Sequence, residues 1–405
     1  MPESSVEESE RFRNRVRAWL EANLPPTLRA NPRRVSEAMV DGAEIPDDVK
    51  TWRARFGATG WGVPAWPKRF GGGGLSPDEI GVLNEEMARI DARNPIGGLG
   101  VMMFGPTLLE FGNEEQLQQH IPPIARNEIR WCQGFSEPGA GSDLASLRMA
   151  AEDFGDHYFL TGQKIWTTGA QFADWCFCLV RTENTPKKHE GISFLLVDMR
   201  SPGVEVRPIK LISGDSQFCE TFFTAVKVPK ANLLGPLNGG WAIAKRLLQH
   251  ERQATSGGAS PLGVPSTLRL GDLARETVGV AGDGRLTDPD LRRRLTEHLM
   301  DARAFELTRA RGEAESRSNS DPSTISSILK NAGSRVGQLR AELTLEVLGH
   351  QGLGWGGEAF APSELASVRT WLLGKSGSIA GGSHEVQNNI IAKRILGLPD
   401  PARSS

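Results

Sequence analysis

The order of helix and strand signals constrains the fold of this chain more than any other feature. Residues 1–128 carry helical patterns, residues 129–235 carry short apolar runs of strand length, and helical patterns return over 236–405. Strands and helices therefore occupy separate blocks. Because a doubly wound dinucleotide fold needs alternating strands and helices, this order argues against it. The sequence predicts a mainly helical α+β protein with three domains at these boundaries.

The strand and helix signals are clearest in five segments. Residues 175–182 and 192–199 are apolar runs of strand length, and 203–212 partly alternates between apolar and polar residues. Polar turns rich in Gly, Pro, Asn and Asp separate them, which predicts a small antiparallel barrel or sandwich. Long helical patterns cover 291–317 and 323–352.

The N-terminal block also contains recognisable helix signals. Val16, Trp19 and Leu20 form an apolar stripe at helical spacing. Four glycines at 71–74 precede Ser76, a good N-cap for a helix that begins at the following proline. The glycines could cradle a phosphate, but no Lys-Ser/Thr pair follows them, so a plain turn is the favoured interpretation.

Composition excludes several classes of protein. The chain has 405 residues, 39% hydrophobic and 24% charged, with a formal net charge of −2. These values are ordinary for a globular protein and give no basic footprint for nucleic acid. No apolar run approaches the ~18 residues of a membrane span. The N-terminus is acidic and then helical, unlike a secretion signal, so we expect a cytoplasmic protein without a membrane span.

The reactive residue types form no familiar catalytic or metal motif. Cys132, Cys176, Cys178 and Cys219 match no zinc spacing, and small core residues in a reducing compartment are favoured over a redox or metal role. The seven histidines do not cluster, and the dinucleotide, P-loop, nucleophile-elbow and zinc-protease motifs are absent. We therefore predict no metal site, and a flavin site would need a different scaffold.

Four segments, in order along the chain, resemble signatures of the acyl-CoA dehydrogenase family. WCQGFSEPGAGSDLASL (131–147) and GQKIWTTGAQFADW (162–175) resemble its flavin-binding signatures. LEVLGHQGL (345–353) resembles a Gly-rich turn that reaches the flavin nucleotide of a neighbouring subunit. SIAGGSHEVQNNIIAKRILGLP (378–399) resembles the last-helix signature. Their order and spacing cover essentially the whole chain.

This resemblance implies a fold and an activity. The fold would be an N-terminal helical domain, a middle β-barrel and a C-terminal four-helix bundle, with FAD between barrel and bundle and across a subunit interface. The activity would be α,β-dehydrogenation of an acyl-CoA thioester to the trans-2-enoyl-CoA, with electrons passed to an electron-transferring flavoprotein. The assembly would be a homotetramer or homodimer, or a hetero-oligomer with a paralogous subunit.

The residue types in these segments suit a flavin. Trp166 can cover part of the flat ring, Thr168 and Ser136 can hydrogen-bond its edge, and Gly139 and Gly141 allow close backbone approach. Taken alone, Trp166 could be a core tryptophan and the glycines a turn. The predicted cofactor-binding residues are Gln133, Phe135, Ser136, Gly141, Ser142, Trp166, Thr167, Thr168, Arg285, Glu346, Gly349, Ser383 and Glu385.

The chain departs from the family pattern in two places. The glutamate that usually serves as base in the last-helix signature falls here on Gly381, which cannot take a proton. The usual pyrophosphate-binding arginine has no direct counterpart; Arg285 lies near its place, and a solvated loop arginine is the alternative. Glu346 and Glu385 are expected near ribose or adenine, because a carboxylate would repel phosphate.

We predict that Glu251 is the catalytic base. It lies three and four residues after Leu248 and Leu247, on the apolar face of a helix over 241–257. Burial would raise the pKa of a carboxyl placed there and favour proton uptake. The alternative is a structural glutamate paired with an arginine, although Arg252 points about 100° away on the helix. Some family members carry their base as a Glu-Arg pair at this position.

Other activities on the same scaffold stay open at this point. The chain could be one subunit of a hetero-oligomeric dehydrogenase, a flavin oxidase or monooxygenase, or a non-catalytic binding protein. The Gly- and Pro-rich segment 255–271 is predicted to interrupt the first bundle helix and enlarge the acyl pocket, with a surface excursion as the alternative.

Overall fold

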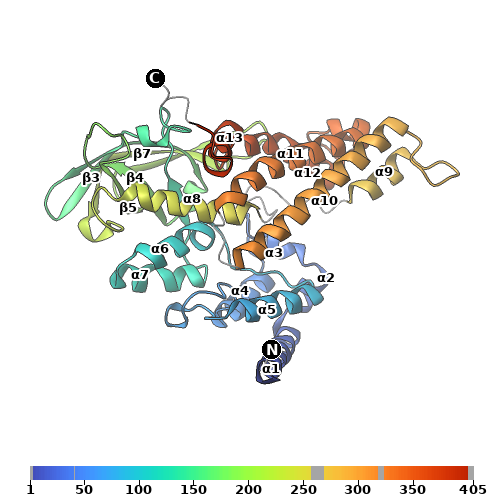
Figure 1. Cartoon of the computed structure of the whole chain (residues 1–405), viewed down its shortest axis with the longest axis horizontal. Helices are drawn as coiled ribbons and strands as arrows, with labels where there is room; N and C mark the ends of the chain where they lie inside the picture. The colour runs from blue at the N-terminus through green and yellow to red at the C-terminus, as the bar shows by residue number, and fades with distance from the viewer. Residues whose placement is uncertain (1–2, 41, 257–268, 318–322, 400–405) are drawn as a thin grey trace. The chain divides into compact units, whose positions relative to one another are not determined.

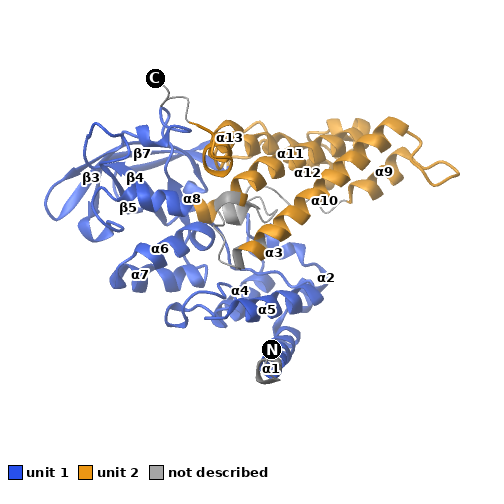
Figure 2. Cartoon of the chain, in the orientation of Figure 1, with its two compact units in different colours: residues 1–209, 217–247 blue, residues 210–216, 248–405 orange. Residues whose placement is uncertain are grey.

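A computed structural model describes residues 3–40, 42–256, 269–317 and 323–399. The chain divides into two compact units, shown in Figure 2. Unit 1 comprises residues 1–209 and 217–247, and unit 2 comprises residues 210–216 and 248–405.

Unit 1 begins with a set of helices whose apolar stripes form a core. Val16 and Leu20 are fully buried, as the stripe predicted, and Trp19 packs edge-on against Trp61 with ring centroids 5.1 Å apart. The helices of this part, shown in blue to cyan in Figure 1, are α1 (Glu3–Asn23), α2 (Pro26–Ala30), α3 (Arg33–Glu37), α4 (Asp47–Ala58), α5 (Pro77–Arg89), α6 (Gly105–Phe111) and α7 (Glu114–Ala125).

The start of α5 confirms the predicted helix signal. The Ser76 hydroxyl accepts the Glu79 N–H at 3.2 Å, and the Glu79 carboxylate accepts the Ser76 N–H at 2.9 Å. This reciprocal capping box satisfies two backbone donors that the helix end would otherwise leave unpaired.

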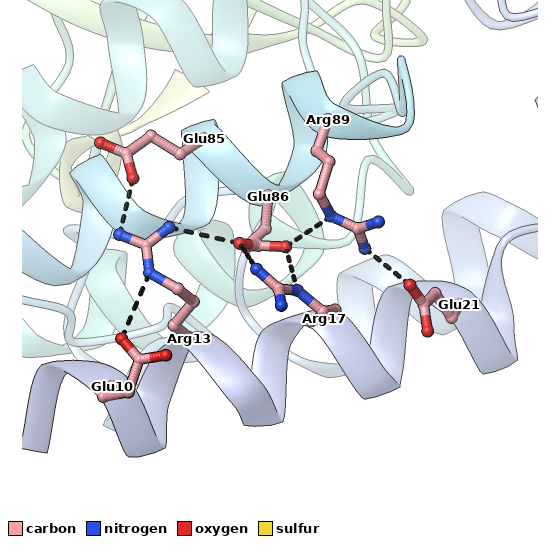
Figure 3. Close-up of polar contacts among 7 residues, drawn as sticks. All are labelled: Glu10, Arg13, Arg17, Glu21, Glu85, Glu86 and Arg89. Atoms are coloured by element: carbon pink, nitrogen blue, oxygen red, sulfur yellow. Dashed lines mark hydrogen bonds and ion pairs between the residues drawn. The ribbon is translucent and has the colours of Figure 1, made fainter. Parts of the chain in front are cut away.

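A buried carboxylate joins α1 to α5 (Figure 3). Glu86 on α5 is 2% exposed, and Arg17 on α1 donates two hydrogen bonds to it, at 2.8 and 2.9 Å. Arg89 and Arg13 donate to the same carboxylate at 2.8 and 3.2 Å. The hydrogen bonds from Arg17, with those of the other two arginines, lower the pKa of Glu86 to about 2.

The second part of unit 1 is a curled seven-stranded sheet that forms a half-barrel. The sheet order is β1-β4-β2-β3-β7-β6, and β5 also pairs with β4. The β1–β4 and β2–β4 pairs are parallel, so the sheet is mixed, whereas the other four strand pairs are antiparallel as expected. The strands are β1 (Trp131–Gly134), β2 (Ala150–Asp153), β3 (His157–Thr168), β4 (Trp175–Arg181), β5 (Ile192–Asp198), β6 (Val204–Ile209) and β7 (Phe218–Pro229).

The interior of the sheet contains all four cysteines. Each is a buried thiol that forms no disulfide, and they lie among apolar side chains such as Leu160 and Phe223. Burial raises the pKa of the Cys178 thiol well above its usual value. These thiols are small core residues, as expected.

Unit 2 is helical and confirms the long helical patterns. Its core joins Leu291 and Leu295 to Leu343 and Val347 across two of the helices. Helix α8 (Gly240–Ser256) begins in unit 1 and ends in unit 2. The others are α9 (Leu270–Val278), α10 (Pro289–Arg317), α11 (Ser323–Leu348), α12 (Pro362–Gly374) and α13 (His384–Ile390).

Two further sequence predictions concern the segment 255–271 and the absence of a membrane-spanning helix. The segment 255–271 falls largely outside the described residues, so its predicted effect on the acyl pocket stays a prediction. Among the helices that the structure describes, none is long and apolar enough to cross a membrane.

Candidate functional site

Trp166 is held out of the sheet by an irregularity in β3. The register of β3 against β7 shifts between Ile165 and Thr167, and Trp166 adopts a left-handed backbone with φ +62°. Its side chain is 53% exposed, with its ring edge-on to Phe218 at 6.0 Å. Left-handed backbone costs an L-residue about 1–2 kcal/mol, and such conformations cluster at functional sites. Trp166 is therefore an accessible aromatic surface and not a core tryptophan.

The two segments that carry the flavin signatures lie side by side at Trp166. The Ser136 carbonyl accepts the Ile165 N–H at 2.9 Å, which places 131–147 against β3. Side chains added at Gly139 and Gly141 would meet no atom within 4 Å, so the backbone there faces open space. Six predicted residues in this region present accessible groups: Gln133, Ser136, Gly141, Ser142, Trp166 and Thr168.

Two predicted cofactor-binding side chains point into the core instead. Phe135 is 4% exposed and packs edge-on against Phe177 and Phe194, each at 5.9 Å. The fully buried Thr167 donates to the Cys219 carbonyl at 2.9 Å and shares a hydrogen bond with Thr221 at 2.7 Å. Their side chains are therefore occupied in the core, and binding of FAD by either residue stays a prediction that concerns their backbone groups.

In unit 2, the Glu251 carboxylate lies against the position where the family usually carries its base. A Cβ at position 381 would lie 3.5 Å from the Glu251 Oε1 atom, an ordinary van der Waals distance. Gly381 and Gly382 both have left-handed backbone, with φ +66° and +92°. The buried Gln387 side chain donates to the Gly381 carbonyl at 2.9 Å and fixes this turn.

The helix that carries Glu251 has the predicted apolar face. Ile243, Ala244 and Leu247 are buried, and Glu251 itself is half-buried. The role of Glu251 as a base stays a prediction.

Ser383 and Glu385 lie at the start of α13, next to the diglycine turn. The Ser383 hydroxyl accepts the Val386 N–H at 3.3 Å and so caps the helix. Glu385 is exposed, and its carboxyl accepts a hydrogen bond from its own backbone N–H, which lowers the pKa of the carboxyl. Capping explains the serine without a ligand, and contact of either residue with FAD stays a prediction.

Three further predicted residues occupy other parts of unit 2. Glu346 on α11 accepts two hydrogen bonds from Arg294 on α10, at 2.5 and 2.6 Å. Gly349 has φ +56° directly after α11, a backbone that a helix end commonly requires. Arg285 is exposed on the α9–α10 connection, with its Nε atom 3.6 Å from Asp283. Their predicted role in nucleotide binding stays untested by these contacts.

Sequence reasoning missed two groups that shape the site. Lys164 is fully buried and paired with Glu137 at 2.8 Å, within the two flavin-signature segments. Gln387 holds the diglycine turn. The lysine had a usable signal, because it lies at even spacing from Tyr158 and Leu160, on the face that a strand would bury, and a buried charge requires a partner. Among the described residues, no group of three or more His, Cys, Asp or Glu could hold a metal ion.

Comparisons with known proteins cover nearly the entire chain. Models of the acyl-CoA dehydrogenase N-terminal, middle and C-terminal domains match residues 6–128, 132–226 and 238–396. The acyl-CoA dehydrogenase IpdE1 of Mycobacterium tuberculosis is 36% identical over 407 residues, covering 98% of this chain and 100% of that protein.

Solved structures agree with this assignment. A steroid ACAD, Tcur3481-Tcur3483, superposes with a TM-score of 0.74 at 29% identity, covering 97% of this chain and 98% of that one. The ChsE4-ChsE5 complex from Mycobacterium tuberculosis gives a TM-score of 0.72 at 28% identity, with coverages of 97% and 98%.

Proposed function

Because this chain belongs to the acyl-CoA dehydrogenase family of flavin-dependent oxidoreductases, we propose that it removes two hydrogens from an acyl-CoA thioester, with Glu251 as the base. The product is the trans-2-enoyl-CoA, and the electrons pass to an electron-transferring flavoprotein. FAD, when bound, supplies the acceptor for the hydride that leaves the β-carbon.

The position of the Glu251 carboxylate carries this proposal. It lies 3.5 Å from the place of a Cβ at Gly381, where a glutamate base would otherwise be attached. A carboxylate that reaches the same region from α8 can take the same α-proton onto its oxygen. The absence of a base at position 381 and the presence of Glu251 are thereby explained together.

Residues around Trp166 fit the chemistry of a flavin. The exposed indole offers a flat aromatic face, and contacts of this kind contribute about 1 kcal/mol beyond burial. Ser136 and Thr168 offer hydroxyl groups to the ring edge, while the open backbone at Gly139 and Gly141 admits a ring or a phosphate. These groups hold and orient the cofactor in the proposed mechanism.

We assign a steroid-derived acyl-CoA as the substrate class. The support is the steroid ACAD, which is similar over nearly the whole of both chains. The lack of a side chain at Gly381 is consistent with a bulky acyl group, because that position occupies little volume beside Glu251.

A hetero-oligomer is the second candidate for the functional form. Two of the similar structures are named as pairs of different proteins, Tcur3481-Tcur3483 and ChsE4-ChsE5. In that case this chain supplies some of the groups of a shared FAD site and a paralogous subunit supplies the others. A purified chain that is colourless and binds FAD only with a paralogue favours this form.

Anaerobic bleaching of the flavin tests the proposal. The chain, reconstituted with FAD, is mixed with steroid-derived, straight, branched and aromatic acyl-CoAs, and the loss of flavin absorbance is followed. Glu251→Gln keeps the shape of the side chain but removes its basicity, so the reduction rate should fall roughly 10²–10⁴-fold while FAD stays bound. Glu358→Gln, an exposed substitution of the same kind in unit 2, is the control and should reduce normally.

Three outcomes would change the assignment. Flavin reduction by Glu251→Gln at the wild-type rate would remove Glu251 as the base. Reduction by straight-chain but not by steroid-derived acyl-CoAs would remove the substrate class. Rapid reoxidation of the reduced flavin by air would favour an oxidase or monooxygenase on the same scaffold.

A further inference from the structure

A lysine ammonium group lies inside the curled sheet, two residues before Trp166. The Lys164 side chain is completely buried, and its Nζ atom donates to the Glu137 carboxylate at 2.8 Å and to the Phe135 carbonyl at 3.1 Å. Because a charge is costly to remove from water, this lysine needs both partners in place. Both belong to the segment that carries the first flavin signature.

Glu137 fastens the loop that follows it. One carboxylate oxygen accepts the Met149 N–H at 2.9 Å, and the other accepts the Arg148 N–H at 2.7 Å. At the near end, Glu137 and Ala140 exchange two backbone hydrogen bonds, at 3.1 and 3.0 Å. Lys164 is thus connected through one carboxylate to both ends of the loop 137–149.

This loop contains the groups proposed to face FAD. Ser136 precedes it, and Gly141 and Ser142 lie within it, while Lys164 is on the same strand as Trp166. A shift of the loop relative to β3 would therefore separate the hydroxyl and backbone groups from the aromatic face. The Ser136–Ile165 backbone hydrogen bond also opposes such a shift.

Stability alone does not account for a buried pair of this kind. Well-packed apolar residues of similar volume often serve a protein core as well or better. A charge-assisted hydrogen bond has a preferred geometry, so it holds the two segments that it joins in a defined relative position. We propose that the Lys164–Glu137 ion pair is a positioning device that sets the loop 137–149 against Trp166 and thereby determines how tightly FAD is held. The inference rests on the FAD site of the proposed function.

The test measures FAD affinity separately from catalysis. Apoprotein of the full chain is titrated with FAD, following flavin fluorescence and visible absorption, for wild type, Lys164→Met and Lys164→Met/Glu137→Gln. The double variant leaves no uncompensated charge in the interior, so it should fold. We expect the dissociation constant of FAD to rise roughly tenfold or more, the change produced by losing one charge-assisted hydrogen bond. The absorption band of the bound flavin should also shift.

A matched control and the thermal unfolding of the apoprotein separate positioning from general damage. Lys187→Met removes an exposed lysine whose ammonium group pairs with Glu190, and it should leave FAD affinity unchanged. Wild-type affinity and absorption in both Lys164 variants would overturn the inference. So would a lower unfolding temperature with unchanged affinity, because the pair would then act on stability alone. Failure of the wild-type protein to bind FAD, both alone and with a paralogous subunit, would remove the proposed function itself.

Discussion

Replacing the buried carboxylate of Glu86 should destabilise unit 1 in a way that depends on pH. In Glu86→Gln the three arginines that surround the carboxylate, Arg13, Arg17 and Arg89, lose their shared negative partner. A neutral amide cannot accept from all three groups as the carboxylate does, and its own N–H groups face the guanidinium donors.

The size of the effect follows from the pKa of Glu86. The pKa of the Glu86 carboxyl falls from 4.5 to about 2 on folding, a difference of about 2.5 pH units. At 1.36 kcal/mol per unit this gives an upper limit of roughly 3.4 kcal/mol. The arginine side chains are between 26% and 41% exposed, and solvent screening reduces the contribution to about 2 kcal/mol.

The sign of the pH dependence is set by a folded-state pKa that lies below the unfolded one. The contribution of Glu86 is fully present above about pH 4.5 and is lost as the pH falls toward 2. The difference in unfolding temperature between wild type and Glu86→Gln should therefore be about 4–8 °C at pH 7 and smaller at pH 3.5.

Differential scanning calorimetry at the two pH values measures this difference. The control is Glu85→Gln, at a neighbouring residue that is 63% exposed and forms an ion pair with Arg13. The free energy of unfolding that this control loses should be that of an exposed ion pair, below about 1 kcal/mol. Equal destabilisation by the two substitutions, or a loss that does not diminish at low pH, would refute the reasoning.

Two further predictions concern the proposed site. Trp166→Ala should weaken FAD binding roughly tenfold in a fluorescence titration and shift the flavin absorption, because an aromatic face is lost, whereas Phe154→Ala, another exposed aromatic in unit 1, should do neither. Gly381→Glu in the Glu251→Gln background should raise anaerobic flavin reduction at least about tenfold over Glu251→Gln alone, since the new side chain starts 3.5 Å from the lost carboxylate. An unchanged rate would mean that the two positions do not serve the same proton.

The local features of this fold could be read from the sequence. The stripe of Val16 and Leu20, the capping box at Ser76 and the long helices each depend on neighbours within one or two turns. The same holds for the apolar runs of β4 and β5, which match their predicted segments closely. Periodicity and cap chemistry are sufficient for such elements because the forces that form them are local.

Long-range pairing could not be read in this way. Nothing in the apolar run 131–134 indicates that β1 pairs in parallel with β4, more than 40 residues away in the sequence. Resemblance supplied Phe135 and Thr167 as cofactor-binding residues, and the structure turns both side chains into the core, Thr167 within β3 and Phe135 directly after β1. Side-chain direction changes with a one-residue shift in register, so a motif identifies the segment more securely than the contacting atoms.

The relation between Gly381 and Glu251 shows how tertiary structure completes a sequence argument. In sequence, a glycine at the place of a base suggests a protein that has lost its catalysis, and a glutamate on an apolar helix face suggests a buried ion pair. The short distance between the Glu251 carboxylate and the Cβ position at 381 connects two residues that are 130 positions apart. The left-handed turn at Gly381, which glycine adopts without strain, keeps a side chain out of this space. Under the proposed function, α8 supplies the carboxylate that a side chain at position 381 would otherwise carry, and Gly381 leaves room beside it.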